Sequence, residues 1–149
     1  MSKSPLHSAI VRRLFQYFFP LIERNPDFAL LKEDPLTLKD SEPEPDLAIV
    51  DAREAEDFHH HPTTAHLVVE VAVTPIEVDR QKAPIYAEAG IPEFWLVRPS
   101  DGEIEVYSRP ENGVYREMTT LSGSDSLGSA TFPDISLSVE ELLRVPSSN

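Results

Sequence analysis

An apolar run with one carboxylate at its centre constrains this chain more than any other feature. Residues 67–73 read LVVEVAV, and apolar residues on both faces of such a run predict a strand in the interior of a sheet. A turn, a short helix that begins near Arg80 or Gln81 and a second apolar run, EFWLV at 93–97, follow. A strand, a helix and a strand in this order predict a parallel crossover between residues 66 and 98.

The N-terminal part predicts a helix and then a β-hairpin. Apolar residues recur at helical spacing over residues 6–22, with Ser4 or Pro5 as the start. The runs FALLKE and LTLKD, between residues 28 and 40, alternate in polarity and are separated by a turn signal, so we expect them to pair as a hairpin. The segment 51–64 is polar and predicts a loop.

The C-terminal part predicts a β-meander that ends in a short helix. EFWLV, EIEVYSR and VYREMT are strand patterns separated by the turn sequences RPSDG and PENG. Ser138 is the expected N-cap of the last helix, with Glu141 completing a capping box. At 149 residues, the chain suits a single domain of α/β (α+β) class.

Composition excludes several functions. The chain has no cysteine, which rules out disulfides, thiolate metal sites and cysteine catalysis. No apolar run approaches the ~20 residues that span a bilayer, and the N-terminus lacks the pattern of a signal peptide, so a cytoplasmic protein is expected. The net charge of −13 opposes tight, non-specific binding of a polyanion. A nucleic-acid function must therefore depend on a local site.

The carboxylate in the buried strand is Glu70. An unpaired charge there costs several kcal/mol, so it needs a partner, a metal or a proton. A strand end that reaches solvent, or an internal ion pair, is the simpler explanation of a lone glutamate. Asp46, however, opens another probable strand directly after a proline. Carboxylates from adjacent strand ends can converge on Mg²⁺, with the backbone carbonyl of Val71 as a third ligand.

A lysine at the start of the following helix completes this set. Pro84 is tolerated only in the first turn of a helix, which places Asp79 near the N-cap and Lys82 in the first turn. A lysine there opposes the helix dipole, a conflict that is explained if it points at the carboxylates. Asp79, Lys82 and Tyr86 are spaced to share one helical face. The simpler alternative is a solvated surface lysine.

These residue types together fit metal-assisted hydrolysis of a phosphodiester. The metal would stabilise charge on the phosphate and lower the pKa of a bound water, and the lysine would position that water or stabilise the transition state.

The histidines of HHHP at 59–62, with His66, could instead suggest a transition-metal site. Consecutive histidines cannot easily face one ion, and a solvated loop is the simpler interpretation.

The segments PEPDLAIV, LVVEVA, DRQKAPIYAEAGIPEFWLV and IEVY resemble the Uma-two family of putative restriction endonucleases, within the PD-(D/E)XK nuclease superfamily. The resemblance covers roughly residues 7–109. It implies a restriction-endonuclease-like mixed β-sheet flanked by helices. It also implies a phosphodiesterase site that depends on Mg²⁺ or Mn²⁺, DNA as the substrate, and a homodimer.

The resemblance also assigns residues. Asp46 matches the "PD" aspartate, and Glu70 matches the acidic residue of the "(D/E)XK" element. The lysine that usually follows two positions later is displaced to Lys82 on the next helix. Tyr86 matches the tyrosine of the family's "K-x-x-x-Y" element, and His7 matches the histidine that begins its first long helix.

The chain departs from the family pattern at several positions. Ala72 stands where the superfamily usually has lysine, and Arg98 stands where the family often has an acid after "WLV". Glu23 is the candidate for the acidic residue that the superfamily often adds from an early helix. The family also tends to carry a segment before this helix, so the single domain at 1–149 is expected to lack an N-terminal segment or to have a misassigned start.

Two functional hypotheses follow. The first is a metal-dependent DNA endonuclease that uses Asp46, Glu70 and Lys82. The second is a catalytically silent interaction module on a nuclease-like fold, which the acidic charge and Arg98 favour. A metal-dependent hydrolase of another phosphate ester is a third.

Overall fold

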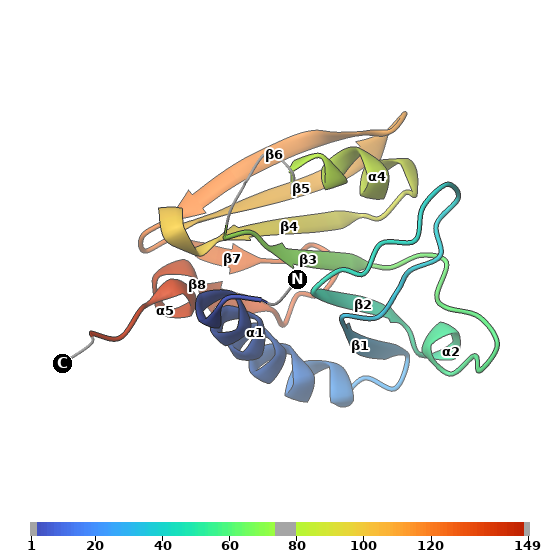
Figure 1. Ribbon diagram of the computed structural model, residues 1–149, viewed down its shortest axis with the longest axis horizontal. Coiled ribbons are helices and arrows are strands. Elements are labelled where there is room, and N and C mark those ends of the chain that lie inside the picture. Colours follow the sequence, from blue (N-terminus) through green and yellow to red (C-terminus); the bar gives the residue numbers. More distant parts are fainter. Residues whose placement is uncertain (1–2, 74–79, 148–149) are drawn as a thin grey trace.

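A six-stranded mixed sheet, with helices on both sides, forms the centre of the computed structural model, which describes residues 3–73 and 80–147 (Figure 1). The strands follow the order β1-β2-β3-β4-β5-β6; β3 and β4 pair parallel, and the other neighbours pair antiparallel. The sheet strands are β1 (Phe28–Lys32), β2 (Leu47–Asp51), β3 (Leu67–Val71), β4 (Glu93–Arg98), β5 (Glu103–Glu111) and β6 (Val114–Ser122). The remaining elements are α1 (Pro5–Glu23), α2 (Ala52–Ala55), α4 (Lys82–Glu88), the 3₁₀ turn η1 (Pro99–Asp101), β7 (Ser126–Gly128), β8 (Ser136–Ser138) and α5 (Val139–Leu143). The predicted mixed sheet flanked by helices is confirmed.

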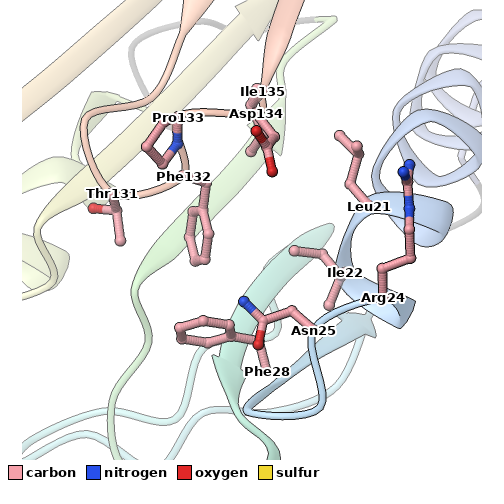
Figure 2. A pocket seen from close by; sticks show the side chains of 10 residues that line it. All are labelled: Leu21, Ile22, Arg24, Asn25, Phe28, Thr131, Phe132, Pro133, Asp134 and Ile135. Atoms are coloured by element: carbon pink, nitrogen blue, oxygen red, sulfur yellow. The ribbon is translucent and has the colours of Figure 1, made fainter.

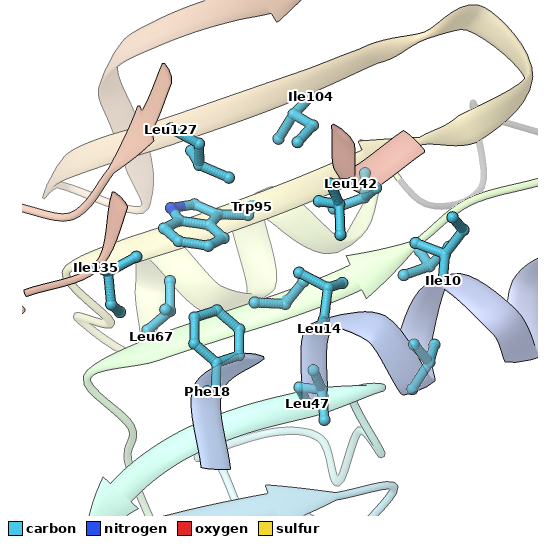
Figure 3. Close-up of a cluster of buried hydrophobic side chains, with 14 of the residues drawn as sticks. Ile10, Leu14, Phe18, Leu47, Leu67, Trp95, Ile104, Leu127, Ile135 and Leu142 are labelled. Atoms are coloured by element: carbon cyan, nitrogen blue, oxygen red, sulfur yellow. The ribbon is translucent and has the colours of Figure 1, made fainter. Parts of the chain in front are cut away.

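The N-terminal helix starts where the sequence predicted. The Ser4 hydroxyl accepts a hydrogen bond from the His7 N–H at 3.0 Å, which satisfies a backbone donor that the first turn of a helix leaves unpaired. The apolar stripe of α1 packs against one face of the sheet, where Phe18 meets Trp95 with ring centroids 5.8 Å apart (Figure 3). Burial of this stripe holds α1 across the strands.

The predicted parallel crossover is confirmed. Strand β3 is buried along its whole length, and its register with β4 runs from Leu67↔Glu93 to Val71↔Val97. The connection between them passes through α4, which covers the other face of the sheet. There, Tyr86 packs on Phe94 with ring centroids 5.1 Å apart.

The C-terminal β-meander is also confirmed, since β4, β5 and β6 are consecutive neighbours. Its second turn consists of Asn112 and Gly113, both with positive φ, 52° and 77°. This is the conformation that a two-residue type I′ hairpin loop requires. The helix α5 has the predicted cap, because the Ser138 hydroxyl accepts a hydrogen bond from the Glu141 N–H at 3.2 Å.

The predicted hairpin between residues 28 and 40 is wrong. Strand β1 pairs with β2, and residues 34–40 form no strand. The backbone N–H groups of Leu36 and Thr37 bond instead to the carbonyls of Pro43 and Pro62. The side chains of Leu36 and Leu38 are buried in the cluster beneath α4, so their apolar character reflects core packing and not strand pairing. The polar segment 51–64 also contains the four-residue helix α2.

None of the helices described in residues 3–73 and 80–147 has the length and apolar character needed to cross a bilayer.

Candidate functional site

The first feature of the site is a pair of carboxylates at the joint end of two strands. The antiparallel register of β2 and β3 ends at Leu47↔Val69, so Asp46 and Glu70 are the next residues outward. The Asp46 N–H lies 3.4 Å from Oε1 of Glu70, and the Val71 N–H donates to Oδ2 of Asp46 at 2.7 Å. Each residue is only 3% exposed. Chain topology thus places two acidic side chains together in a poorly solvated position.

The carboxylate of Glu70 faces the helix α4. The hydroxyl of Tyr86 donates to Oε2 at 2.8 Å, and the Lys82 ammonium lies 3.3 Å from the same oxygen. The two donors are four residues apart in the chain and therefore lie on one side of the helix. Lys82 is the first residue of α4 and keeps about a third of its side chain exposed (34%), while Tyr86 is fully buried.

The carboxylate of Asp46 faces the start of α1. Nε2 of His7 lies 3.1 Å from Oδ1 of Asp46, and Nζ of Lys3 lies 3.8 Å from the same oxygen. His7 is buried, and among the described residues its Nδ1 has no hydrogen-bond partner. The ends of two helices on opposite sides of the sheet therefore approach the carboxylate pair.

Burial disfavours the ionised form of Glu70 more strongly than its partners favour it. Burial raises the pKa of Glu70 to about 7; the Lys82 charge and the Tyr86 hydrogen bond act against this rise, and the negative charge of Asp46 adds to it. Burial and the neighbouring carboxylates also raise the pKa of Tyr86, which therefore remains a protonated donor. A further cation bound beside Glu70 would lower this pKa and favour the ionised carboxylate.

Another buried carboxylate, Glu105, lies on the same face of the sheet as Glu70. It accepts hydrogen bonds from the guanidinium groups of Arg80 and Arg98 and from the Tyr107 hydroxyl at 2.6 Å. Burial acts to raise its pKa, but the hydrogen bonds and charges of these partners outweigh burial and lower it. Arg98 also contacts the carboxylate of Glu103 at 3.0 Å. Glu105 is thus an ionised group with its own cations.

The chemistry of the donor set decides which metal the carboxylate pair fits. The described residues contain no group of three or more histidine, cysteine, aspartate or glutamate side chains that could hold a metal. Asp46 and Glu70 offer hard oxygen ligands only, and Mg²⁺ commonly uses one or two carboxylates and keeps several waters. The pair therefore fits Mg²⁺ or Mn²⁺ better than a closed transition-metal site.

Comparison with known proteins identifies the family. The model of the Uma2 family, described as putative restriction endonucleases, matches residues 1–140. The chain belongs to this family. A crystal structure of a putative nuclease belonging to DUF820 from Anabaena variabilis ATCC 29413 has the same fold, with a TM-score of 0.81 at 15% sequence identity over 96% of this chain and 83% of that one. No curated protein matches. Family and fold together support a nuclease, for which nucleic acid is the substrate.

Most of the predicted site residues of this Uma2 chain lie together. The structure brings Asp46, Glu70, Lys82, Tyr86 and His7 into one group of contacts, with Val71 bonded to Asp46 through its backbone N–H. Their catalytic and ligand roles remain predictions.

Three further sequence candidates lie elsewhere. Asp79 falls outside the described residues. Glu23 is the last residue of α1, on the order of 24 Å along the helix axis from His7, so the prediction that it joins the site is wrong. The histidines at 59–61 are exposed, in agreement with a solvated loop.

The sequence did not reveal two parts of this region. Lys3 lies beside Asp46 because the first turn of α1 lies over the end of β2, a contact with no local signal. Glu105 and Arg80 pair across 25 residues of chain. The alternation of EIEVY showed that Glu105 and Tyr107 share a face, but not that α4 covers that face.

A separate hollow lies at the far end of α1. Ten residues line it: Leu21, Ile22, Arg24 and Asn25 at the end of that helix and just after it, Phe28 on β1, and residues 131–135 (Figure 2). Its volume is about 280 Å³. None of its lining residues belongs to the carboxylate group, so the hollow and the candidate site are distinct.

Proposed function

We propose that this chain is a metal-dependent DNA endonuclease that hydrolyses phosphodiester bonds. The observation that supports it is the carboxylate pair: Oε1 of Glu70 lies 3.4 Å from the Asp46 N–H, and the Lys82 ammonium lies 3.3 Å from Oε2. Asp46, Glu70 and the backbone carbonyl of Val71 would hold Mg²⁺ or Mn²⁺. The lysine of the PD-(D/E)XK pattern is displaced from position 72, which is alanine here, to Lys82 on α4.

Each residue has a defined part in this proposal. The bound metal would supply Lewis-acid stabilisation of the phosphate charge and a water of lowered pKa. Lys82 brings a positive charge to the carboxylate pair while part of its side chain stays open to solvent, so it would stabilise charge on the phosphate or orient the attacking water. Tyr86 orients Glu70 through its hydroxyl, and His7 orients Asp46.

The acidic surface limits how DNA could be bound. With a net charge of −13, phosphate contacts spread over the surface would be unfavourable. A local site avoids this problem, because Lys3 and Lys82 flank the carboxylate pair from two sides and the metal would add two positive charges. We therefore expect weak binding without metal and a strong dependence of binding on metal and salt.

The test is cleavage of supercoiled plasmid and linear duplex DNA by the purified protein with Mg²⁺, with Mn²⁺ and with EDTA. We expect cleavage with metal only, and a loss on the order of 10²–10³-fold or more for Asp46→Asn, Glu70→Gln and Lys82→Met. Glu117→Gln and Arg116→Met on the exposed β6 are matched controls that should retain full activity. Activity that survives all three site substitutions would contradict the proposal.

A catalytically silent interaction module is the second candidate. The specific observation in its favour is that Glu70 already has a cation, Lys82, and a hydroxyl donor, Tyr86, so the fold does not require a metal. Titration calorimetry with Mn²⁺ separates the two. Binding that disappears in Asp46→Asn argues for the nuclease, and the absence of binding argues for the module.

The family resemblance also predicts a homodimer, which we include in the proposal. Sedimentation velocity on the purified chain of 16.7 kDa would give its mass in solution.

A further inference from the structure

A row of residues across the sheet links the carboxylate pair to Glu105. In the register, Glu70 on β3 lies opposite Leu96 on β4, and Leu96 lies opposite Glu105 on β5. Directly opposite residues on neighbouring strands point to the same face, and strands lie about 4.8 Å apart. The two glutamates therefore lie on the α4 face, roughly 10 Å from each other, with one leucine between them.

Two cations near the start of α4 reach these two glutamates. Lys82 contacts Glu70 at 3.3 Å, and Arg80, two residues earlier, donates from Nε and a terminal nitrogen to the two carboxylate oxygens of Glu105. Such a two-point contact between guanidinium and carboxylate fixes orientation as well as distance. Contacts with Glu70 and Glu105 therefore hold Lys82 at the start of α4 and Arg80 just before it.

Among the described residues, α4 itself offers few side chains that would fix its start. The helix has seven residues, and its N-cap residue, Gln81, makes no side-chain capping bond. Its buried side chains apart from Tyr86 are the small residues Ala83 and Ala87. Lys82 in the first turn opposes the helix dipole, which makes that end less stable. A short helix of this kind depends on tertiary contacts for its position.

Glu105, in contrast, is rigidly held. It is 1% exposed, and the Tyr107 hydroxyl donates to one of its oxygens while Arg98 donates to the other at 3.0 Å. Arg98 is fixed in turn by Glu103 and by Asp101 at 2.6 Å. The carboxylate is a fixed point on the sheet to which Arg80 is attached.

We propose that Glu105 is a positioning residue: by holding Arg80, it fixes the start of α4 and thereby places the Lys82 ammonium beside Glu70. Its consequence for catalysis rests on the proposed function, but its effect on the position of Lys82 does not. Arg98 supports Glu105 in this role, because its guanidinium donates to the same carboxylate.

The first test measures the position of Lys82 without any nuclease assay. Surface lysines are acetylated in the folded, full-length protein, and mass spectrometry gives the labelling rate of Lys82 relative to the exposed Lys32 and Lys39. In Arg80→Ala and in Glu105→Gln, we expect the relative rate for Lys82 to rise severalfold, because the ammonium leaves Glu70. Glu103→Gln is the matched control, since Glu103 contacts Arg98 but makes no described contact with Arg80. The labelling rate of Lys82 in this variant should equal that in the native chain.

Arg80→Ala keeps the test decisive if Glu105→Gln fails to fold, because Arg80 is 45% exposed at its side chain and its removal leaves Glu105 with Arg98 and Tyr107. An unchanged acetylation rate of Lys82 in folded Arg80→Ala overturns the proposal.

A second, kinetic test uses Arg80→Ala in the DNA cleavage assay, where kcat should fall about tenfold or more with KM nearly unchanged. If the native chain cleaves no DNA but Lys82 is acetylated faster in Arg80→Ala, Glu105 positions Lys82 and the proposed nuclease function is rejected.

Discussion

Glu70 and Glu105 are the same residue type, both with little solvent exposure, on the same face of one sheet, yet their pKa values are shifted in opposite directions. Two guanidinium groups and a tyrosine satisfy Glu105, and its pKa is lowered despite burial. Glu70 has one ammonium, one tyrosine and a second carboxylate beside it, and burial raises its pKa to about 7. Glu105 contacts two cations, whereas Glu70 contacts one and lies beside a second negative charge.

This difference separates a structural carboxylate from a candidate ligand. Burial alone does not identify a functional acid, since both glutamates are buried. The direction of the pKa shift is informative, because carboxylates whose pKa is strongly perturbed by burial and a specific charge partner cluster at functional sites. The comparison can be tested by changing each glutamate and its tyrosine in turn.

The largest effect on stability is expected at Glu105. Replacement by alanine leaves the guanidinium of Arg98, 15% exposed, without one of its carboxylates, and the loss of one partner from a buried ion pair costs about 3–5 kcal/mol. Glu103→Ala, on the same strand and also a partner of Arg98, should cost less than about 1 kcal/mol because Glu103 is 35% exposed. Urea unfolding of both variants measures the difference. Equal costs would show that Glu105 is not the fixed point we infer.

The next effect is a dependence of stability on pH at Glu70. Its folded pKa is raised from 4.5 to about 7, so the folded state holds this proton more tightly than the unfolded state does. The resulting stabilisation is complete below pH 4.5 and is lost as the pH rises through 7; it amounts to about 3 kcal/mol.

Urea unfolding with EDTA between pH 5 and 8 measures this effect. Glu70→Gln cannot ionise and should lose less stability over this range than the native chain, while Mg²⁺ in place of EDTA should restore the stability of the native chain at pH 8. Parallel curves for the native chain and Glu70→Gln would contradict the raised pKa.

The smallest effects compare the two tyrosines. Tyr86→Phe and Tyr107→Phe each remove a hydroxyl donor to a buried carboxylate, at a cost of about 1 kcal/mol. The cost of Tyr86→Phe should grow from pH 5 to pH 8, as Glu70 ionises and its hydrogen bond strengthens. The cost of Tyr107→Phe should stay constant, because Glu105 is ionised throughout. The same dependence on pH in both variants would remove the distinction between the two sites.

The sequence predicted those parts of the fold that carry local signals. The Ser4 cap, the apolar stripe of α1, the buried run of β3 and the Asn112-Gly113 turn each act over a few residues, and each was confirmed. The pairing of β1 was mispredicted because LTLKD has the alternation of a strand, whereas its leucines serve the core beneath α4. Alternation of polar and apolar residues within a segment does not show whether that segment pairs with a neighbouring strand.

The contacts of the candidate site also divide into those that the sequence predicted and those that depend on tertiary packing. Asp46, Glu70 and Lys82 were predicted to meet because a charge in a buried strand demands a partner, and they lie together. Lys3, Arg80 and Glu105 were not predicted, since their contacts depend on how the two helices lie against the sheet. An exposed lysine or arginine gives no indication in the sequence of the carboxylate it will reach.

The position of Asp46 and Glu70 just beyond the last paired residues of β2 and β3 has a thermodynamic consequence. The two carboxylates are 24 residues apart in the chain and adjoin only when these strands are in their native register. A divalent ion that needs both would therefore bind the folded chain and not the unfolded one, and at 100 times its dissociation constant it would add about 2.7 kcal/mol to the free energy of unfolding. The melting temperature itself then reports whether the ion binds, with no nucleic acid present.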